Sequence, residues 1–415
     1  MGSSPSKRAA KAGKKDHKLR ASSLGLTKLP KMFCTIPNLE EVWLQDNKIS
    51  ELPQDLISSW TCAELIYCTN NPVKALPVTV SQWIALEEVN FSGSNLTSLP
   101  PEVGHWLALR QAYFNDLPNL QALPEEIGNW CELKVLHLNN CGLKALPQEI
   151  DQLLNLTMVS LNNNQLETLP PGIGNWAKVE KMFLNNNKLT CIPEEISGCY
   201  SLEKLYMDGN QLTVLPEALG DMKNLNEFYI RNNLLTELIP TLCHVKTLNK
   251  LYVSNNQLST LPLELSQLQE LEILHANHNR LTSIPTNLGT LSKLKFLHLA
   301  HNQLEFLPNS LSQLTLLRVF EIEDNPALSA RSAGVNINES TTTSSSRAIV
   351  LEFDSGDSTE GEAKLSTENI TEMTDLDSSK QPESEEVEES PHTRTSRPRG
   401  LSLLEEIQLV KGWTF

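Results

Sequence analysis

The sequence predicts an α/β solenoid, with a curved parallel sheet on the concave face, short helical or 3-10 turns on the convex face, and disordered N- and C-terminal tails. Three observations support this fold class. A pattern of the form LxxLxLxxNxLxxLP recurs about every 23 residues through most of the chain. Each copy contains an LxL alternation, which is typical of a short strand with one buried face. The composition changes at both ends of the array, where the pattern stops.

The repeat pattern is clear in segments such as LEKLYMDGNQLTVLP at 202–216. Thirteen registers follow a degenerate one at 24–30. Their shared polar column should satisfy backbone groups of neighbouring turns through buried amides, and its Ser and Cys members should give weaker turns. The column consists of Asn47, Asn71, Ser94, a blurred repeat at 109–124, Cys141, Asn164, Asn187, Asn210, Asn233, Asn256, Asn279, Asn302 and Asn325.

Five tryptophans occupy one position of the repeat, eleven residues before the polar column. Leucine or methionine fills the same position in other repeats. We therefore interpret these tryptophans as core packing on the convex side rather than as a binding stripe. They are Trp60, Trp83, Trp106, Trp130 and Trp176.

These motifs resemble the leucine-rich-repeat family over roughly three quarters of the chain. The 23-residue spacing and the LPxxIxxL segments are similar to the intracellular Ras-group and Scribble/Erbin-type repeats. The resemblance implies a protein-interaction function, in Ras-type GTPase signalling or in cell-polarity complexes. No RVxF-type phosphatase-docking segment occurs in the N-terminal region, which argues against a phosphatase scaffold.

We divide the chain into four segments. Residues 1–15 form a basic head, and residues 16–330 form the solenoid of 13 to 14 repeats. Residues 331–400 form an acidic, Ser/Thr/Glu-rich tail, and residues 401–415 form a short amphipathic C-terminal motif. The tail is expected to be disordered, because such a composition does not bury enough apolar surface to fold.

Composition excludes several classes of function. The formal net charge of −16 argues against nucleic acid as a partner. The sequence shows no membrane-spanning run and no secretory signal, and its eight cysteines are scattered, so we expect reduced thiols in an intracellular protein. No nucleotide-binding, zinc-protease or hydrolase motif occurs. We therefore predict no enzyme activity, no cofactor and no metal site.

The residue four positions before each polar-column residue should point away from the core, toward the concave face. Five of the six tyrosines in the protein fall at this position. Because neighbouring strands lie about 4.8 Å apart, we expect an accessible aromatic ladder that either packs on itself or binds a folded partner. The predicted partner-binding residues are Trp43, Tyr67, Tyr113, His137, Phe183, Tyr206, Tyr229, Tyr252, His275 and His298.

Two further groups are expected on the same face. A basic edge formed by Lys181, Lys204, Arg231 and Lys250 predicts an acidic partner. An Asn-rich region lies beside it, in which we expect Asn162 to be exposed.

Four histidines, at 275, 278, 298 and 301, fall on two adjacent predicted strands. An ordinary polar contact patch, a pH-sensitive contact and a zinc site are the alternatives. We predict no metal, because nothing in a flat sheet face enforces tetrahedral convergence.

The N-terminus fits the M-G-x-x-x-[ST] myristoylation pattern, with Gly2 as the acceptor, and is similar to the lipidated N-terminus of Src-type kinases. A basic cluster follows, and it would supply the second signal that stable binding to an anionic membrane requires. A nuclear import signal and a soluble basic tail are the alternatives. The predicted membrane-binding residues are Lys7, Arg8, Lys11, Lys14, Lys15, Lys18 and Arg20.

The last three residues, Trp413, Thr414 and Phe415, fit the apolar-x-apolar ending that PDZ domains accept by strand addition.

From these features we predict a cytoplasmic interaction scaffold that is peripheral on the inner leaflet of the plasma membrane. It would bind a folded protein, such as a small GTPase or a polarity protein, in signal transduction. A soluble regulatory subunit or inhibitor of an enzyme is the alternative, because it would use the same face without needing a membrane.

Overall fold

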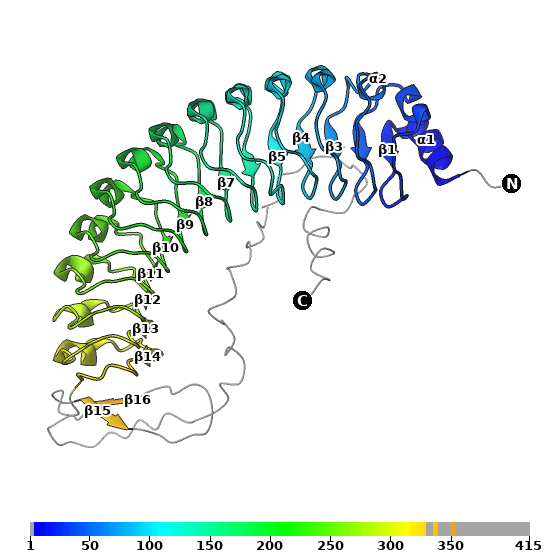
Figure 1. The fold of residues 1–415 in the computed structure, drawn as a ribbon. Coiled ribbons are helices and arrows are strands. Elements are labelled where there is room, and N and C mark those ends of the chain that lie inside the picture. Colours follow the sequence, from blue (N-terminus) through cyan, green and yellow to red (C-terminus); the bar gives the residue numbers. More distant parts are fainter. Residues whose placement is uncertain (1–3, 329–334, 339–349, 354–415) are drawn as a thin grey trace, which may run out of the picture. The chain divides into compact units, whose positions relative to one another are not determined.

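The computed structural model describes residues 4–328, 335–338 and 350–353. Fourteen parallel strands form one open, curved sheet in chain order, which Figure 1 shows along the arc of the solenoid. The predicted solenoid is therefore confirmed. The strands are β1 Lys18–Arg20, β2 Glu41–Trp43, β3 Leu65–Tyr67, β4 Glu88–Asn90, β5 Gln111–Tyr113, β6 Val135–His137, β7 Met158–Ser160, β8 Lys181–Phe183, β9 Lys204–Tyr206, β10 Glu227–Tyr229, β11 Lys250–Tyr252, β12 Ile273–His275, β13 Phe296–His298 and β14 Val319–Glu321.

Short helical turns cover the convex side, one between each pair of successive strands from β1 onward. Most are preceded by a proline, whose fixed φ suits an extended entry to the turn and whose missing N–H is not needed there. The turns are η1 Lys31–Thr35, α2 Gln54–Ile57, η2 Val78–Gln82, η3 Pro101–His105, η4 Glu125–Asn129, η5 Gln148–Gln152, η6 Pro171–Asn175, η7 Glu194–Gly198, η8 Glu217–Asp221, η9 Pro240–His244, η10 Leu263–Gln267, η11 Leu288–Thr290 and η12 Asn309–Gln313.

The asparagine column ties each turn to the one before it. The Nδ2 group of Asn210 donates to the carbonyl oxygens of Met207, in its own turn, and Leu184, in the preceding repeat, both at 3.0 Å. Its Oδ1 accepts a hydrogen bond from the backbone N–H of Leu189 at 3.1 Å. The same three-way contact recurs along the array, for example at Asn233. The predicted role of the buried amides is confirmed.

The column is weaker between residues 94 and 141, as predicted. The Ser94 hydroxyl is buried without a hydrogen-bond partner among the described residues. Leu117 stands at the polar position of the blurred repeat and is fully buried. The thiol of Cys141 donates to the Phe114 carbonyl at 3.1 Å, but it offers no acceptor equivalent to an amide oxygen.

The tryptophan column is core, as the sequence indicates. All five indoles are buried, and the first four stack in order with ring centroids 5.9 to 6.1 Å apart. From the second indole on, each Nε1–H donates to a carbonyl oxygen of the preceding repeat, as Trp106 does to Val80 at 2.8 Å. The last four rings thus bury their apolar surface with their one polar group paired, whereas the buried N–H of Trp60 has no hydrogen-bond partner among the described residues.

The N-terminal head differs from the expected disordered tail. Residues Pro5–Asp16 form helix α1, whose first turn is capped by the side chain of Ser4. Ala10 and Gly13 are buried on the side that packs against β1. A Cβ atom at Gly13 would lie 3.0 Å from both the Ile36 side chain and the Lys18 carbonyl, so the absent side chain permits this approach. The Ala- and Lys-rich composition favours a helix, and the apolar stripe gives it a docking side.

The predicted disordered tail at 331–400 is also interrupted by structure. Residues Val335–Asn338 (β15) and Val350–Phe353 (β16) form an antiparallel pair. Val335 and Ile337 in β15, and Val350 and Phe353 in β16, are β-branched or aromatic residues, which favour strands. The remainder of the predicted tail and the C-terminal motif at 401–415 lie outside the described residues.

Replacing Asn210 by Leu tests the polar column. The substitution leaves one N–H and two carbonyl groups without their side-chain partner, so we expect the free energy of unfolding to fall by roughly 1–3 kcal/mol. Urea denaturation followed by circular dichroism measures this change. Exposed Asn309, whose side chain has no hydrogen bond to any residue that the structure describes, is the matched control, and Asn309→Leu should change stability by less than about 0.5 kcal/mol. Equal midpoints for the two variants would contradict the role assigned to the column.

Candidate protein-binding surface

The predicted concave column forms a stack of rings. In β8 to β13, the third residue of each strand pairs in register with the third residue of the next. The resulting centroid distances are 4.7, 4.4, 4.3, 4.7 and 3.9 Å along the series Phe183, Tyr206, Tyr229, Tyr252, His275 and His298. Tyr252 and His275 meet edge-on, and the other pairs are stacked. We call this series the ring stack. The spacing of the strands matches the contact distance of stacked rings, so the sheet itself sets the geometry.

The other predicted column residues form shorter pairs. Trp43 stacks on Tyr67 at 4.4 Å, and Tyr113 meets His137 edge-on at 5.1 Å. Asn90 and Ser160 occupy the positions between these groups, where no ring continues the series. All ten predicted residues thus share one column, but they fall into three groups.

The rings are less accessible than the sequence suggested. The exposed fraction is 6% for Tyr206 and 8% for Tyr229. Stacked neighbours cover both faces of these two rings, so mainly their edges remain for a partner. The prediction of freely accessible tyrosines is therefore wrong, and the self-packing alternative describes the uncomplexed surface.

The basic edge is half neutralised by acidic side chains that the sequence analysis did not assign. Glu227 lies between Lys204 at 3.3 Å and Lys250 at 3.2 Å, and it accepts a hydrogen bond from the Tyr229 hydroxyl at 2.9 Å. Burial and the adjacent carboxylate both raise the pKa of Tyr229 above its usual range, so it stays a donor at neutral pH.

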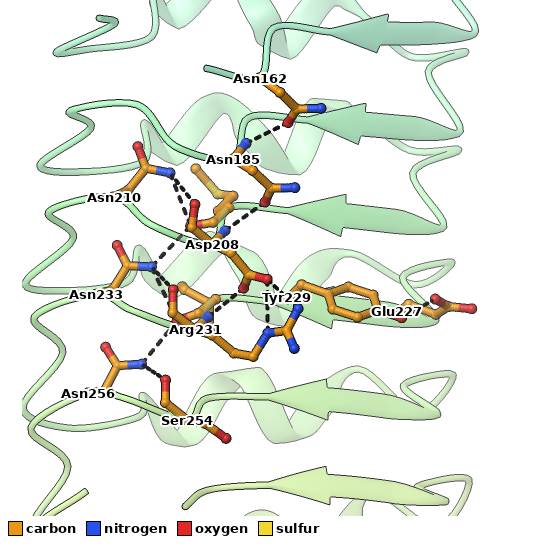
Figure 2. A network of polar contacts seen from close by, with 12 residues as sticks. Asn162, Asn185, Asp208, Asn210, Glu227, Tyr229, Arg231, Asn233, Ser254 and Asn256 are labelled. Atoms are coloured by element: carbon orange, nitrogen blue, oxygen red, sulfur yellow. Dashed lines mark hydrogen bonds and ion pairs between the residues drawn. The ribbon is translucent and has the colours of Figure 1, made fainter. Parts of the chain in front are cut away.

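Arg231 makes the second neutralising contact, which Figure 2 shows. Its Nε and Nη2 groups donate to one carboxylate oxygen of Asp208 at 2.9 and 2.7 Å. The guanidinium also lies 5.8 Å from the Tyr229 ring centroid and 5.4 Å from that of Tyr252. Burial raises the pKa of Asp208, although Arg231 offsets part of this effect. With Lys181 included, four cations and two carboxylates leave this cluster at +2.

The Asn-rich region forms a second hydrogen-bond ladder that sequence reasoning missed. The side-chain oxygen of Asn162 accepts from the backbone N–H of Asn185 at 2.8 Å, and Asn185 accepts likewise from Asp208 at 2.8 Å. Asp208 in turn accepts from the Arg231 N–H at 2.6 Å. Asn162 is half-buried and is not the free surface residue we expected. The sequence does contain a signal for this ladder: a Ser, Asn or Asp stands two residues after the ring position in successive repeats.

The four histidines separate into two columns. His275 and His298 belong to the ring stack, where His298 Nδ1 lies 2.8 Å from Glu321. His278 and His301 stack on each other at 4.1 Å and have φ values of 53° and 54°. That left-handed position is filled by Asn, Asp or Gly in most other repeats, so these two histidines occupy a turn site. Within the described part of the chain, no group of three or more possible metal ligands is found.

The basic head is divided between two elements. Five of its seven cations are exposed on α1, whereas Lys18 and Arg20 belong to β1. Lys18 pairs with Glu41 at 2.5 Å, and Arg20 pairs with Asp16 at 2.6 Å. The predicted lipidation site Gly2 and the predicted PDZ motif Trp413, Thr414 and Phe415 lie outside the described residues. None of the described helices is both long and apolar enough to span a membrane.

Comparisons with known proteins agree with this architecture. Family models for leucine-rich repeats match residues 155–212, 247–268 and 293–314. A leucine-rich-repeat protein of Leptospira interrogans is 28% identical, with 80% of this chain and 95% of that chain covered and a TM-score of 0.57. The plant peptide hormone receptor RGFR1, solved in complex with RGF2, is 25% identical over 74% of this chain and 53% of its own, with a TM-score of 0.57.

A third similar structure, the Drosophila Toll–Spatzle complex, shares the fold at 21% identity, with a TM-score of 0.65 over 74% of this chain and 44% of that one. A search of curated proteins finds no match. The repeats, the sheet and these matches show that the chain contains leucine-rich repeats and has the solenoid fold that such repeats form. This fold generally serves as a protein-interaction module rather than as an enzyme, and no catalytic family is among the matches.

Acidification should weaken the ring stack. Burial, with the charge of His298 and Arg231, lowers the pKa of His275 to about 3, so the unfolded chain binds this proton more tightly than the folded protein does. Stability should be fully retained above about pH 6.5 and should fall as the pH drops from there toward 3. We expect a loss of up to about 2 kcal/mol at pH 5 from this residue.

His275→Phe keeps a stacking ring without the titrating group, so the fall in thermal midpoint between pH 7 and pH 5 should become smaller. Exposed His244 lies outside the ring stack and provides the control His244→Phe. An unchanged pH dependence in the His275 variant would exclude it as the source.

Proposed function

We propose that this protein is an interaction scaffold that binds a folded protein across β8 to β13. The observation that carries the proposal is the ring stack together with its charged cluster. These side chains form a continuous strip on the concave face, and packing of the solenoid core does not require tyrosine there. The RGFR1 receptor, solved with RGF2 bound, is an example of a similar fold that takes a partner.

The strip suits binding because it is already ordered. Stacking fixes the rings, and the ion pairs fix Arg231 and Glu227. A partner would therefore immobilise few additional side chains, which lowers the entropic cost of association. The exposed ring edges and the cluster charge of +2 favour an acidic surface with flat apolar groups.

For the class of partner we propose a Ras-type GTPase or a cell-polarity protein, in line with the similarity of the repeats to the Ras-group and Scribble/Erbin types. A regulatory subunit or inhibitor of an enzyme is the second candidate, since the same strip would serve it. Membrane attachment separates the two, because the second candidate does not require it.

We also propose that the N-terminal head attaches the protein to the cytoplasmic leaflet, through acylation of Gly2 and the cations of α1. The helix supports this role in one respect. Lys7, Arg8, Lys11, Lys14 and Lys15 are all exposed and, at 100° per residue, share one side of α1, which does not include the buried residues Ala10 and Gly13. Each cation near an anionic surface contributes about 1 kcal/mol. A PDZ domain at Trp413–Thr414–Phe415 is a further proposed partner.

Partner binding is tested with the double charge reversal Lys181→Glu and Lys250→Glu. Both residues are half-exposed at the edge of the strip, so the fold should be retained while the cluster charge changes from +2 to −2. Proteins captured from a cytosolic extract by the full-length chain and identified by mass spectrometry should be lost on reversal and should bind the natural sequence more weakly at high salt.

The control for partner capture is Lys188→Glu with Lys144→Glu, two exposed lysines away from the strip. If this variant loses the same proteins, or if neither variant loses any, then the concave strip is not the binding site.

Membrane binding is tested on unacylated full-length protein with vesicles of phosphatidylcholine and phosphatidylserine. The triple variant Lys7→Glu, Lys11→Glu and Lys14→Glu should bind on the order of 100-fold more weakly, because three favourable charges are reversed. Lys28→Glu, Lys48→Glu and Lys74→Glu make the same net charge change at exposed sites on the solenoid and should have a much smaller effect. In cells, Gly2→Ala should move the protein to the soluble fraction. Equal vesicle binding by the two triple variants would contradict the role of α1.

A further inference from the structure

An exposed apolar row follows one flank of the solenoid, away from the concave strip. It occupies the position directly after the convex core column, in the turn that leads from each 3-10 helix to the next strand. Ile84, Leu107, Leu154 and Tyr200 are 65%, 61%, 54% and 69% exposed, respectively. With exposed Cys131 and half-exposed Ala177, they fill this position in six successive repeats. We call these six residues the flank row.

Backbone contacts show that members of the flank row are neighbours. The Asn155 side chain, which directly follows Leu154, donates to the Cys131 carbonyl at 2.8 Å. The backbone N–H of Ser201, which follows Tyr200, donates to the Ala177 carbonyl at 3.2 Å. These two pairs of successive members therefore lie in adjacent, hydrogen-bonded turns. A contiguous apolar surface of this kind is unusual on a monomer and marks an interaction site.

The flank row has defined ends. The same position is Thr61 in the repeat before Ile84, and it is Lys223 and then Lys246 in the repeats after Tyr200, all exposed. Polar residues are thus compatible with the turn, and the fold does not require apolar ones in the six repeats between. Core packing therefore does not explain the row.

We propose that the flank row is a self-association surface that pairs two copies of this chain in antiparallel fashion. The repeats of the arc in Figure 1 present their flanks side by side. The two copies would be related by a twofold axis that lies along the radius of the arc and passes between Cys131 and Leu154. Their flank rows would then run in opposite directions and curve in the same way. Leu107 then faces Ala177 of the second copy, and Ile84 faces Tyr200, so large residues meet small ones at the inner contacts.

The charges beside the flank row fit the same arrangement. Three residues after each member comes a column that includes Glu87, Arg110, Glu180 and Glu203. In the antiparallel pair, Arg110 of one copy lies opposite Glu180 of the other, and the twofold axis makes this contact twice. Glu87 would face Glu203, but Arg110 already pairs with Glu87 at 2.8 Å within each copy and reduces that repulsion. The register that buries the six residues of the flank row thus makes one opposite-charge contact, Arg110 with Glu180, and one like-charge contact, Glu87 with Glu203, each of them twice.

This association would leave the ring stack and α1 free, because neither belongs to the flank. The proposal therefore does not depend on the proposed partner or on membrane attachment. Six side chains form a small interface, so we expect a dissociation constant of roughly micromolar order.

Sedimentation equilibrium of the full-length protein tests the proposal. The average mass should rise from 46.4 kDa toward twice that value as the concentration increases through the micromolar range. Leu107→Lys with Leu154→Lys should raise the dissociation constant at least tenfold, and lysine is compatible with this turn because Lys223 and Lys246 occupy it elsewhere. Val214→Lys with Leu263→Lys, at residues 56% and 61% exposed outside the row, is the matched control and should still dimerise.

The charge contact provides a second test. Arg110→Glu should weaken association, and adding Glu180→Arg in the same chain should restore it. A mass of 46.4 kDa at every concentration would overturn the proposal, as would equal effects of the two lysine pairs or no rescue by the second charge change.

Cross-linking tests the register. Cys131 is exposed and lies beside the proposed twofold axis, whereas exposed Cys191 does not belong to the flank row. With the other accessible cysteines replaced by Ser, a short bismaleimide should link two chains that retain Cys131 and should not link chains that retain Cys191. Burial raises the pKa of Cys68, Cys141, Cys199 and Cys243 to about 12, so these thiols should not react. Equal linkage through both positions would rule out this register.

Discussion

The buried asparagine amide is the interaction on which the rest of this structure depends. A three-residue strand followed by an irregular turn leaves several backbone groups without partners, and water cannot reach them inside the solenoid. One amide, such as that of Asn210, supplies two donors and an acceptor to three of these groups at once. It thereby fixes both the shape of its own turn and the distance to the preceding turn. A leucine of similar size would fill the space and supply none of these contacts.

This fixed spacing explains why side chains act in columns. Each residue meets its equivalents in the adjacent repeats at one strand spacing, so a ring at one register contacts a ring at the next, and a carboxylate contacts the base beside it. The ring stack, the Asp208–Arg231 contact and the second asparagine ladder all arise in this way. A residue on this sheet therefore has properties that depend on the residue about 23 positions away as much as on its neighbours in sequence.

The sequence predicted those features that a single repeat determines. The registers, the asparagine and tryptophan columns and the concave direction of the tyrosines follow from periodicity alone. Ring burial and charge neutralisation depend on pairs of repeats. Nothing in its own repeat indicates that Glu227 forms ion pairs, because its partners Lys204 and Lys250 come from the repeats before and after it. Helix α1 lies outside the periodic pattern, so periodicity does not predict it. Its basic composition is typical of a disordered tail, and the small residues Ala10 and Gly13, through which it packs, were therefore not recognised.

The weak part of the asparagine column has a consequence for how the solenoid responds to temperature. Ser94, Leu117 and Cys141 fall in three successive repeats, where stacked tryptophans and the Phe91–Phe114 pair, at 6.3 Å, join neighbouring turns that lack the full set of amide contacts. Apolar association weakens on cooling, whereas the amide ladder of the later repeats does not rely on it. In a solenoid each repeat is stabilised by its immediate neighbours. Cold should therefore loosen these three repeats first, and the repeats on either side of them would then unfold as distinct cooperative units.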